Sequence, residues 1–350
     1  MTNKNEKYKI SIALQGGGAH GAFAWGIMDK LLEDGRFDIC GISGTSAGGM
    51  NAASVIQGLL EGDNETARKR LNDYWMAISD MSAKMRFEST NHQEKKDFLE
   101  SEQDIFNLHH NWFQMLGGAL SQYLSPYQFN PTNKNNFLDF LKGFFNFDIF
   151  KNDMSRRIFL GATHVKSGKI KVFSNQDMSA DVLMASACLP HLFQTVEIDG
   201  EHYWDGGFIA NPAIYPLMSL DADNILVVQL TKTYCDEIPT TKEGIVDRLK
   251  EITYNGCLVR EMRAIYFISK MIDDGIIKEG AMRRFYMHIL KSEETFKDLK
   301  LSSALNPKWE FITALKAKGQ ETAQNWINEF LSNDPKTKQD LESKFKDFIS

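Results

Sequence analysis

The sequence predicts an α/β fold, a three-layer sandwich in which a central, mostly parallel sheet lies between layers of helices. Two observations lead to this prediction. Short apolar strands alternate with helices from residue 9 onward, and this order favours right-handed crossovers between parallel strands. The segment NILVVQL at 224–230 is a continuous apolar run, as expected for a strand that is covered on both faces.

The elements follow from apolar spacing and from turn residues. We expect strands at about 9–14, 38–43, 157–164, 169–174, 195–204, 224–230 and 284–291. We expect helices at about 20–34, 47–61, 64–80, 179–187, 241–275, 307–331 and 336–349.

A glycine-rich loop follows the first predicted strand. The strand KISIAL leads into QGGGAHG at 15–21, and apolar residues at helical spacing begin directly afterwards with Phe23, Ile27 and Leu31. A strand, a glycine loop and a helix start together form an anion-binding corner, because backbone N–H groups and the helix dipole both favour negative charge.

This corner has two candidate uses. Gly16, Gly18 and Gly21 match the dinucleotide fingerprint G-x-G-x-x-G, whereas an oxyanion hole would use the N–H groups of Gly16, Gly17 and Gly18. A dinucleotide site requires an acidic residue at the end of the second strand, to hold the ribose. The acid of the second strand, Asp38, lies at its other end, and this favours the oxyanion hole.

The second strand ends in Gly44-Thr45-Ser46-Ala47-Gly48, a G-x-S-x-G sequence. Such a sequence lifts a serine onto a sharp turn between a strand and a helix, where its hydroxyl is exposed. Gly44 and Gly48 allow the strand and the helix to cross without a steric clash. Ser46 is therefore the candidate nucleophile.

A third motif, Asp205-Gly206-Gly207, follows a predicted hairpin, TVEIDGEHYW, whose turn is Asp199-Gly200. Asp205 then stands at the end of a strand, and the two glycines let the chain turn tightly behind it. Taken alone, the motif also fits an ordinary Asp-Gly turn.

Together, GGGAHG at 16–21, GTSAG at 44–48 and DGG at 205–207 resemble, in this order, the bacterial type of the patatin-like phospholipase family. The stretch MASACLPHLFQTVEIDGEHYWDGGFIANP also looks like the approach to the catalytic aspartate of that family. One departure is His20, where many members carry Lys or Arg. The resemblance implies a catalytic domain over residues 8–230 and a C-terminal helical elaboration, 231–350, packed on it.

For mechanism, the resemblance implies a serine lipid acyl hydrolase that uses a Ser–Asp dyad and no histidine. Ser46 would attack the ester carbonyl, Asp205 would act as general base, and the loop at 16–18 would hold the oxyanion. Supporting roles fall to the remaining motif glycines Gly21, Gly44, Gly48, Gly206 and Gly207. The implied substrates are phospholipids or lysophospholipids, with peripheral membrane contact left open and with no cofactor or metal.

Three alternatives remain open. Ser46, Asp205 and His288 stand in the order of an α/β-hydrolase triad, although Ser46 follows only the second strand of the chain. An acyltransferase could use Ser46 with His164 and hold a carboxylate with Arg68 and Arg70, but would leave the DGG motif and the glycine loop without roles. A non-catalytic scaffold is the third alternative.

Composition narrows the function classes. The formal net charge of −6 gives no reason to expect nucleic-acid binding. We find no apolar run of about 18 residues and no secretory signal, so we expect a cytoplasmic protein, with signal-independent export left open. The 4 cysteines lie far apart and are expected to be free thiols, and no metal-ligand spacing occurs. The oligomeric state is left open.

An insertion, 84–135, interrupts the predicted α/β pattern. Residues 84–103 are polar, whereas 104–124 are rich in apolar and aromatic side chains. That apolar stretch is either a cap that lines an acyl-chain groove or a helix that packs on the core. The aromatic cluster at 137–150 and the long helix at 241–275 are expected to pack on the core, with a partner or membrane surface as the alternative for the long helix.

Overall fold

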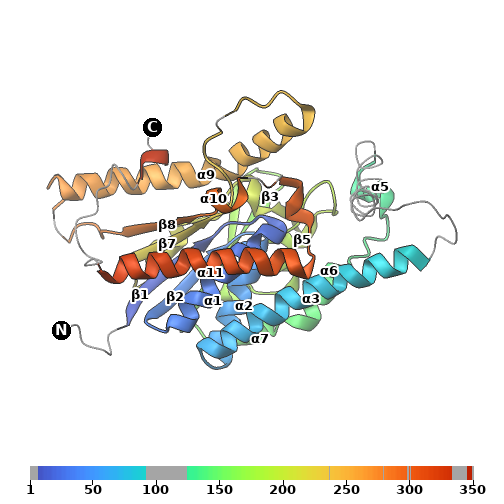
Figure 1. The fold of residues 1–350 in the computed structure, drawn as a ribbon, viewed down its shortest axis with the longest axis horizontal. Coiled ribbons are helices and arrows are strands. Elements are labelled where there is room, and N and C mark those ends of the chain that lie inside the picture. The colour runs from blue at the N-terminus through green and yellow to red at the C-terminus, as the bar shows by residue number, and fades with distance from the viewer. Residues whose placement is uncertain are drawn as a thin grey trace.

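A single mixed sheet lies at the centre of the protein (Figure 1). The computed structural model describes residues 7–91, 124–235, 237–278, 280–297, 299, 301–332 and 345–348. Within these residues the sheet has eight strands: β1 (Tyr8–Leu14), β2 (Phe37–Gly44), β3 (Arg157–His164), β4 (Ile170–Ser174), β5 (Val196–Ile198), β6 (Glu201–Asp205), β7 (Asn224–Gln229) and β8 (Tyr286–Lys291).

The strand order is β5-β6-β3-β2-β1-β7-β8, with β4 paired to β3 outside this path. Strands β3, β2, β1, β7 and β8 run parallel to one another, whereas β4 and β6 are antiparallel to β3. The predicted mostly parallel sheet is confirmed, and its antiparallel edge comes from the β5–β6 hairpin that turns at Asp199-Gly200.

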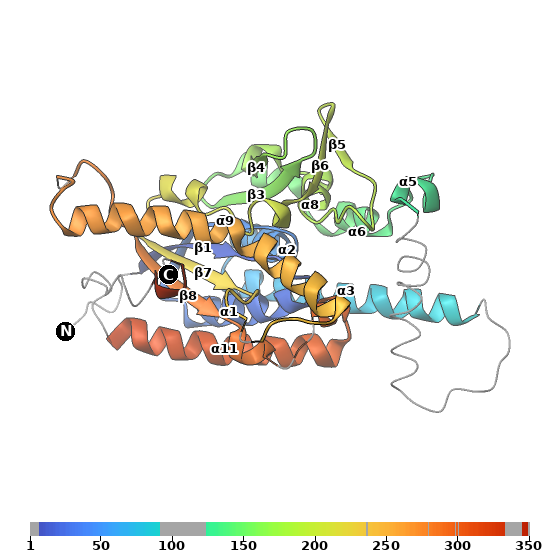
Figure 2. The same ribbon diagram turned by 90° about the horizontal axis from the view of Figure 1, so that it is seen from above.

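Helices cover both faces of this sheet (Figure 2). The α-helices are α1 (Gly21–Asp34), α2 (Ala47–Glu61), α3 (Asn64–Asn91), α5 (Pro126–Phe129), α6 (Asn136–Phe144), α7 (Phe147–Asn152), α8 (Ala180–Ser186), α9 (Lys242–Asp273), α10 (Glu293–Phe296) and α11 (Trp309–Ser332). Short 3-10 helices are η1 (Gly18–His20), η3 (Asn175–Asp177), η4 (Gly206–Phe208), η5 (Tyr215–Ser219) and η6 (Leu301–Leu305). Among the helices that can be described, none combines the length and the apolar character needed to span a bilayer.

The alternation of side chains along β1 divides the core into two layers. Ile10, Ile12 and Leu14 pack with helices α1, α2, α3 and α11 on one face, whereas Ala13 packs on the other face with α9 and the helical turn 345–348. This period of two is the normal consequence of a pleated strand between two helix layers. The C-terminal region also adds strand β8 to the sheet.

The insertion differs in part from its prediction. Helix α3 continues to Asn91 and so runs past the predicted end at residue 80 into the polar segment. Most of the apolar stretch at 104–124 lies outside the described residues. The aromatic cluster at 137–150 packs on the core through α6 and α7, with Leu141, Phe145 and Phe150 buried.

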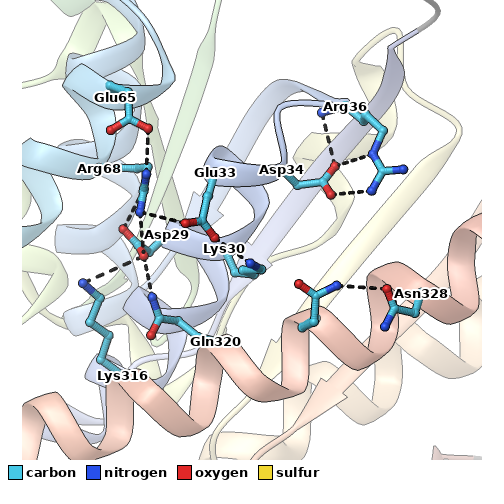
Figure 3. Close-up of polar contacts among 11 residues, drawn as sticks. Asp29, Lys30, Glu33, Asp34, Arg36, Glu65, Arg68, Lys316, Gln320 and Asn328 are labelled. Carbon is cyan, nitrogen blue, oxygen red and sulfur yellow. Dashed lines mark hydrogen bonds and ion pairs between the residues drawn. The ribbon is translucent and has the colours of Figure 1, made fainter. Parts of the chain in front are cut away.

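A buried carboxylate joins three helices on the α1 face (Figure 3). Asp29 of α1 is 3% exposed and accepts hydrogen bonds from Arg68 of α3 at 3.0 Å and from Gln320 of α11 at 2.7 Å. Lys316 of α11 adds an ion pair with the same carboxylate at 3.8 Å. A buried charge with this many partners is compensated, so Asp29 fixes how α3 and α11 dock on α1.

Helix α11 approaches α1 at the level of the backbone. A Cβ added at Gly319 would overlap the carbonyl oxygen of Phe23, and a Cβ added at Gly26 would overlap the carbonyl oxygen of Lys316. The two glycines therefore set the distance between these helices, as small residues do wherever two backbones meet closely.

We expect Gly319→Ala to lower the free energy of unfolding by about 1–3 kcal/mol, because the methyl group would force α11 away from α1. Gly143→Ala in α6 is the matched control, since nothing lies within 4 Å of its added Cβ. The control should leave stability unchanged or raise it slightly. Urea unfolding measures both, and equal stability of Gly319→Ala and wild type would contradict the close contact.

Candidate active site

Ser46 occupies the turn between β2 and α2. Its backbone has φ 53° and ψ −125°, which places a residue other than glycine in the sparsely populated left-handed half of the map. The Ser46 N–H donates to the carbonyl oxygen and to the hydroxyl of Ser186, each at 3.1 Å. Ser46 is half-buried, whereas its chain neighbours Thr45 and Ala47 are buried.

The glycines of the G-x-S-x-G sequence are needed for close approach. A Cβ at Gly44 would overlap the backbone of Gly48, and a Cβ at Gly48 would overlap the carbonyl oxygen of Leu14. A side chain at Gly44 would separate β2 from α2, a side chain at Gly48 would separate α2 from β1, and either would move Ser46. The expected strand-to-helix crossing is therefore present.

Strand register brings Asp205 to the level of Ser46. Gly44 of β2 pairs with Leu160 of β3, and Ala162, two residues further along β3, pairs with Asp205 of β6. Ser46 lies two residues beyond Gly44, and so it stands at the same height on the sheet as Asp205. The DGG glycines enter η4, where Gly206 passes close to the backbone of Gly161.

The Asp205 carboxyl group is buried and accepts a backbone hydrogen bond. It is 2% exposed, and its Oδ1 accepts from the N–H of Gly207 at 2.7 Å. The Ser46 side chain lies close enough to the same carboxylate to favour its charged form. Burial raises the pKa of Asp205 from 3.8 to about 7, although the Gly207 N–H and the Ser46 side chain both oppose that rise. Asp205 can therefore take up and release a proton near neutral pH.

The glycine loop lies directly beside Ser46. A Cβ added at Gly16 would lie 2.8 Å from the Cβ of Ser46. The Gly16 N–H, however, donates to Oδ1 of Asn211 at 2.7 Å and is occupied. The amides of Gly17 and Gly18 have no acceptor among the residues that the structure describes. Within that part of the chain, these two N–H groups are unoccupied donors of the loop.

His20 stands where the resemblance leads us to expect Lys or Arg. It is 5% exposed, hydrogen bonds through Nε2 to the Ser303 hydroxyl at 2.7 Å, and contacts the ring of Phe296. Burial lowers the pKa of His20 to about 4, so the ring is neutral at neutral pH. Gly21 follows it at the start of α1, against Ala47 and Trp75.

A buried amide network that the sequence did not reveal holds the loop. Gln15 is fully buried, and its Nε2 donates to the Asn211 carbonyl at 2.9 Å and to Oδ1 of Asn255 at 3.2 Å. Its Oε1 accepts from the amides of Leu230 and Thr231 at 2.7 and 3.0 Å. Asn255 belongs to α9, so a helix far along the chain fixes the start of the glycine loop.

Tyr254, the neighbour of Asn255, lies against the aspartate turn. Its ring would be 3.3 Å from a Cβ added at Gly207, and it meets the ring of Phe208 edge-on with centroids 6.0 Å apart. Burial and the nearby charge of Asp205 raise the pKa of the Tyr254 hydroxyl. Helix α9 thus forms one wall of the site.

Histidines that other mechanisms would use are engaged elsewhere. His164 hydrogen bonds to Glu201 at 2.9 Å and to Ser167 at 2.7 Å. His288 lies on β8, two strands beyond β1 on the side away from Asp205, and contacts the Asn224 side chain and the ring of Trp326.

Two arginines and a cysteine are likewise placed in structural contacts. Arg68 pairs with Asp29, and Arg70 pairs with Glu61 at 2.6 Å, so neither presents a free guanidinium to Ser46. Cys188 has a buried, free thiol. Its backbone carbonyl oxygen accepts a hydrogen bond from the N–H of Asp205 at 2.8 Å. Burial and the charge of Asp205 raise the pKa of this thiol to about 12.

Comparison with known proteins shows the family. The family model for patatin-like phospholipases matches residues 12–218, more than half of the 350-residue chain. The chain therefore belongs to the patatin-like phospholipase family, which hydrolyses lipid acyl esters. No curated protein sequence matches the chain.

Several solved structures are similar to the chain at low identity. They include VipD from Legionella pneumophila, with 14% identity and a TM-score of 0.36, and the ExoU–SpcU complex from the type III secretion system of Pseudomonas aeruginosa, with 15% identity and a TM-score of 0.38. The matches cover 90% and 93% of this chain, but only 67% and 52% of the chains matched. The chain thus spans between half and two thirds of the length of these structures.

We expect Asn255→Leu to loosen the glycine loop, because a leucine cannot accept the hydrogen bond of Gln15. Hydrogen–deuterium exchange of peptides covering residues 15–21 should become faster by about tenfold or more. Met262→Ala is the control, since it weakens the packing of the same helix without touching Gln15. Unchanged exchange in Asn255→Leu, or equal acceleration in both variants, would contradict the proposed role of the network.

Proposed function

We propose that this chain cleaves carboxylic esters of phospholipids or lysophospholipids through a Ser46–Asp205 dyad. The observation that carries the proposal is the Ser46 side chain beside a buried carboxylate whose pKa is raised to about 7. A general base works best when its pKa lies near the working pH, and an exposed aspartate would be too weak a base. Membership of the patatin-like family supports a lipid ester as the substrate.

The reaction begins with attack of the Ser46 Oγ on the ester carbonyl carbon. The Ser46 proton passes to Asp205, and the carbonyl oxygen becomes a tetrahedral oxyanion. Collapse of this intermediate breaks the bond to the alcohol, which takes the proton from Asp205 and leaves the acyl group on Ser46. Asp205 then takes a proton from water as that water attacks the acyl-enzyme. Collapse of the second tetrahedral intermediate breaks the bond to the Ser46 Oγ, which takes the proton back from Asp205, and the fatty acid is released.

We assign backbone N–H groups of the glycine loop to stabilise the oxyanion. Gly17 and Gly18 offer free N–H groups, whereas the N–H of Gly16 is held by Asn211 and serves to shape the loop. Ser46 also stands at the N-terminus of α2, whose dipole favours negative charge there. Each oxyanion donor is worth about 10²–10³ in rate.

The acyltransferase and triad alternatives have less support. The first would need His164, which is held by Glu201, and the second would need His288, which is packed against Trp326. The dyad uses the three motifs together and leaves none of them without a role.

We expect Ser46→Ala and Asp205→Asn each to reduce fatty-acid release from phosphatidylcholine by about 10³-fold or more. The first removes the nucleophile, and the second removes the base while it keeps the size of the side chain. Mass spectrometry of the released products measures the loss.

Two matched variants control for folding. Ser54→Ala changes a buried serine on the same helix as Ser46, and Asp199→Asn changes the hairpin turn before Asp205. Both should keep near wild-type rates. Full activity of Asp205→Asn would refute the dyad, and a wild-type chain that released nothing from any lipid ester would favour a scaffold.

The rate should rise with pH through about 7. Asp205 must be ionised to accept the proton of Ser46, and its pKa is raised to about 7, so activity is present above that value and lost below it. We expect kcat/KM for a soluble ester to increase about tenfold per pH unit between pH 5 and about 6.5, and to level off above about 7.5. A flat profile over this range would mean that an aspartate with an ordinary pKa, or another group, serves as the base.

A further inference from the structure

The N-terminal half of α9 exposes an apolar face. Figure 1 shows this gold segment standing away from the sheet at the top of the molecule. Ile245, Leu249 and Ile252 are 44%, 59% and 54% exposed. Their spacing puts them on one side of the helix, and we call them the α9 stripe. The buried residues of α9 begin only at Asn255.

Polarity on these turns is partly inverted with respect to a normal surface helix. Lys250 is exposed, but two other charged side chains between the stripe residues turn toward the protein: Arg248 and Glu251 are 22% and 19% exposed and pair at 3.0 Å. Arg248 also donates to the carbonyl oxygen of Thr233 at 3.0 Å. A helix in water normally buries its apolar face and exposes its charges. The outward aliphatic face therefore matches an apolar environment outside the protein.

The stripe lies on the helix that borders the Asp205 turn. Ile252 is two residues, or about 3 Å along the helix axis, from Tyr254. Tyr254 lies against Gly207, the residue whose N–H binds the Asp205 carboxylate. The stripe and Tyr254 lie on opposite sides of the same turns of α9, so an apolar surface that contacted the stripe would lie across this helix from the Asp205 turn.

Charges around the stripe nearly cancel. Between residues 237 and 252, Lys242, Arg248 and Lys250 face four acids, Glu237, Glu243, Asp247 and Glu251. Attraction to acidic lipids needs a cluster of basic residues, and no such cluster is present in this segment. This balance matches a zwitterionic surface, bound through apolar area rather than through charge.

We propose that the α9 stripe inserts into the surface of a zwitterionic phospholipid bilayer and presents the active site to its substrate there. The proposal rests on the lipid hydrolase function proposed above and extends it to the physical form of the substrate. A helix that lies in the interface buries its apolar face at the boundary between headgroups and acyl chains.

The test compares the double variant Leu249→Gln/Ile252→Gln with Phe267→Gln, a control at a 62% exposed position on the same helix but outside the stripe. The probe is phosphatidylcholine vesicles, with binding measured by flotation. The double variant should partition at least about tenfold less than wild type, and the control should partition like wild type. Raising the salt concentration to about 0.5 M should change wild-type binding less than about twofold.

Hydrolysis assays distinguish a loss of membrane binding from a loss of catalysis. The double variant should lose activity on vesicles in parallel with binding, while it hydrolyses a short, monomeric p-nitrophenyl ester within about twofold of wild type. If the wild type bound vesicles but hydrolysed neither substrate, the proposed function would be refuted and membrane binding by the stripe would still be supported. The Ser46→Ala variant is expected to bind vesicles and to hydrolyse neither substrate.

Three results would overturn the inference. Equal vesicle binding by the double variant and wild type would show that the stripe does not insert. Loss of wild-type binding in salt would point to charge instead of apolar contact. Light scattering that shows a dimer in wild type and a monomer in the double variant would mean that a second copy of the chain covers the stripe.

Discussion

The burial of one carboxyl group, Asp205, is the constraint on which the rest of the site depends. Taking a carboxylate out of water is costly, and the protein offsets part of this cost with the hydrogen bond from Gly207 and with the nearby Ser46 side chain. Burial leaves a group whose pKa lies near neutral pH, and we propose that it exchanges its proton with the Ser46 hydroxyl. The register of β2, β3 and β6 places the two residues at one height.

The same site draws on parts of the chain that lie far apart in sequence. The glycine loop follows β1, the serine turn follows β2, and the aspartate follows β6, while Asn255 and Tyr254 come from α9. Helix α9 lies beyond residue 218, where the family match ends. In this chain a C-terminal helix therefore fixes the glycine loop, forms a wall of the site and carries the α9 stripe.

Local patterns explain why so much of the fold could be predicted. Strand alternation, helical spacing and the glycines around Ser46 are readable within short windows, and the strands and most helices lie where these patterns place them. The occupied N–H of Gly16 could not be predicted, because its acceptor on Asn211 is 195 residues away and ordinary in type. The inward orientation of Arg248 and Glu251 could not be predicted from the sequence either, because helical spacing alone does not say which face of a helix meets the protein.

The central claim is that Ser46 is reactive because a buried Asp205 accepts its proton. Labelling with a fluorophosphonate, followed by peptide mass spectrometry, tests it directly because the probe reports the nucleophile itself and needs no lipid surface. With a pKa of about 7, the ionised fraction of Asp205 rises by about two orders of magnitude between pH 5 and pH 8, and the rate of Ser46 labelling should rise with it. Labelling at another residue, or a rate at Ser46 that does not depend on pH, would contradict the account.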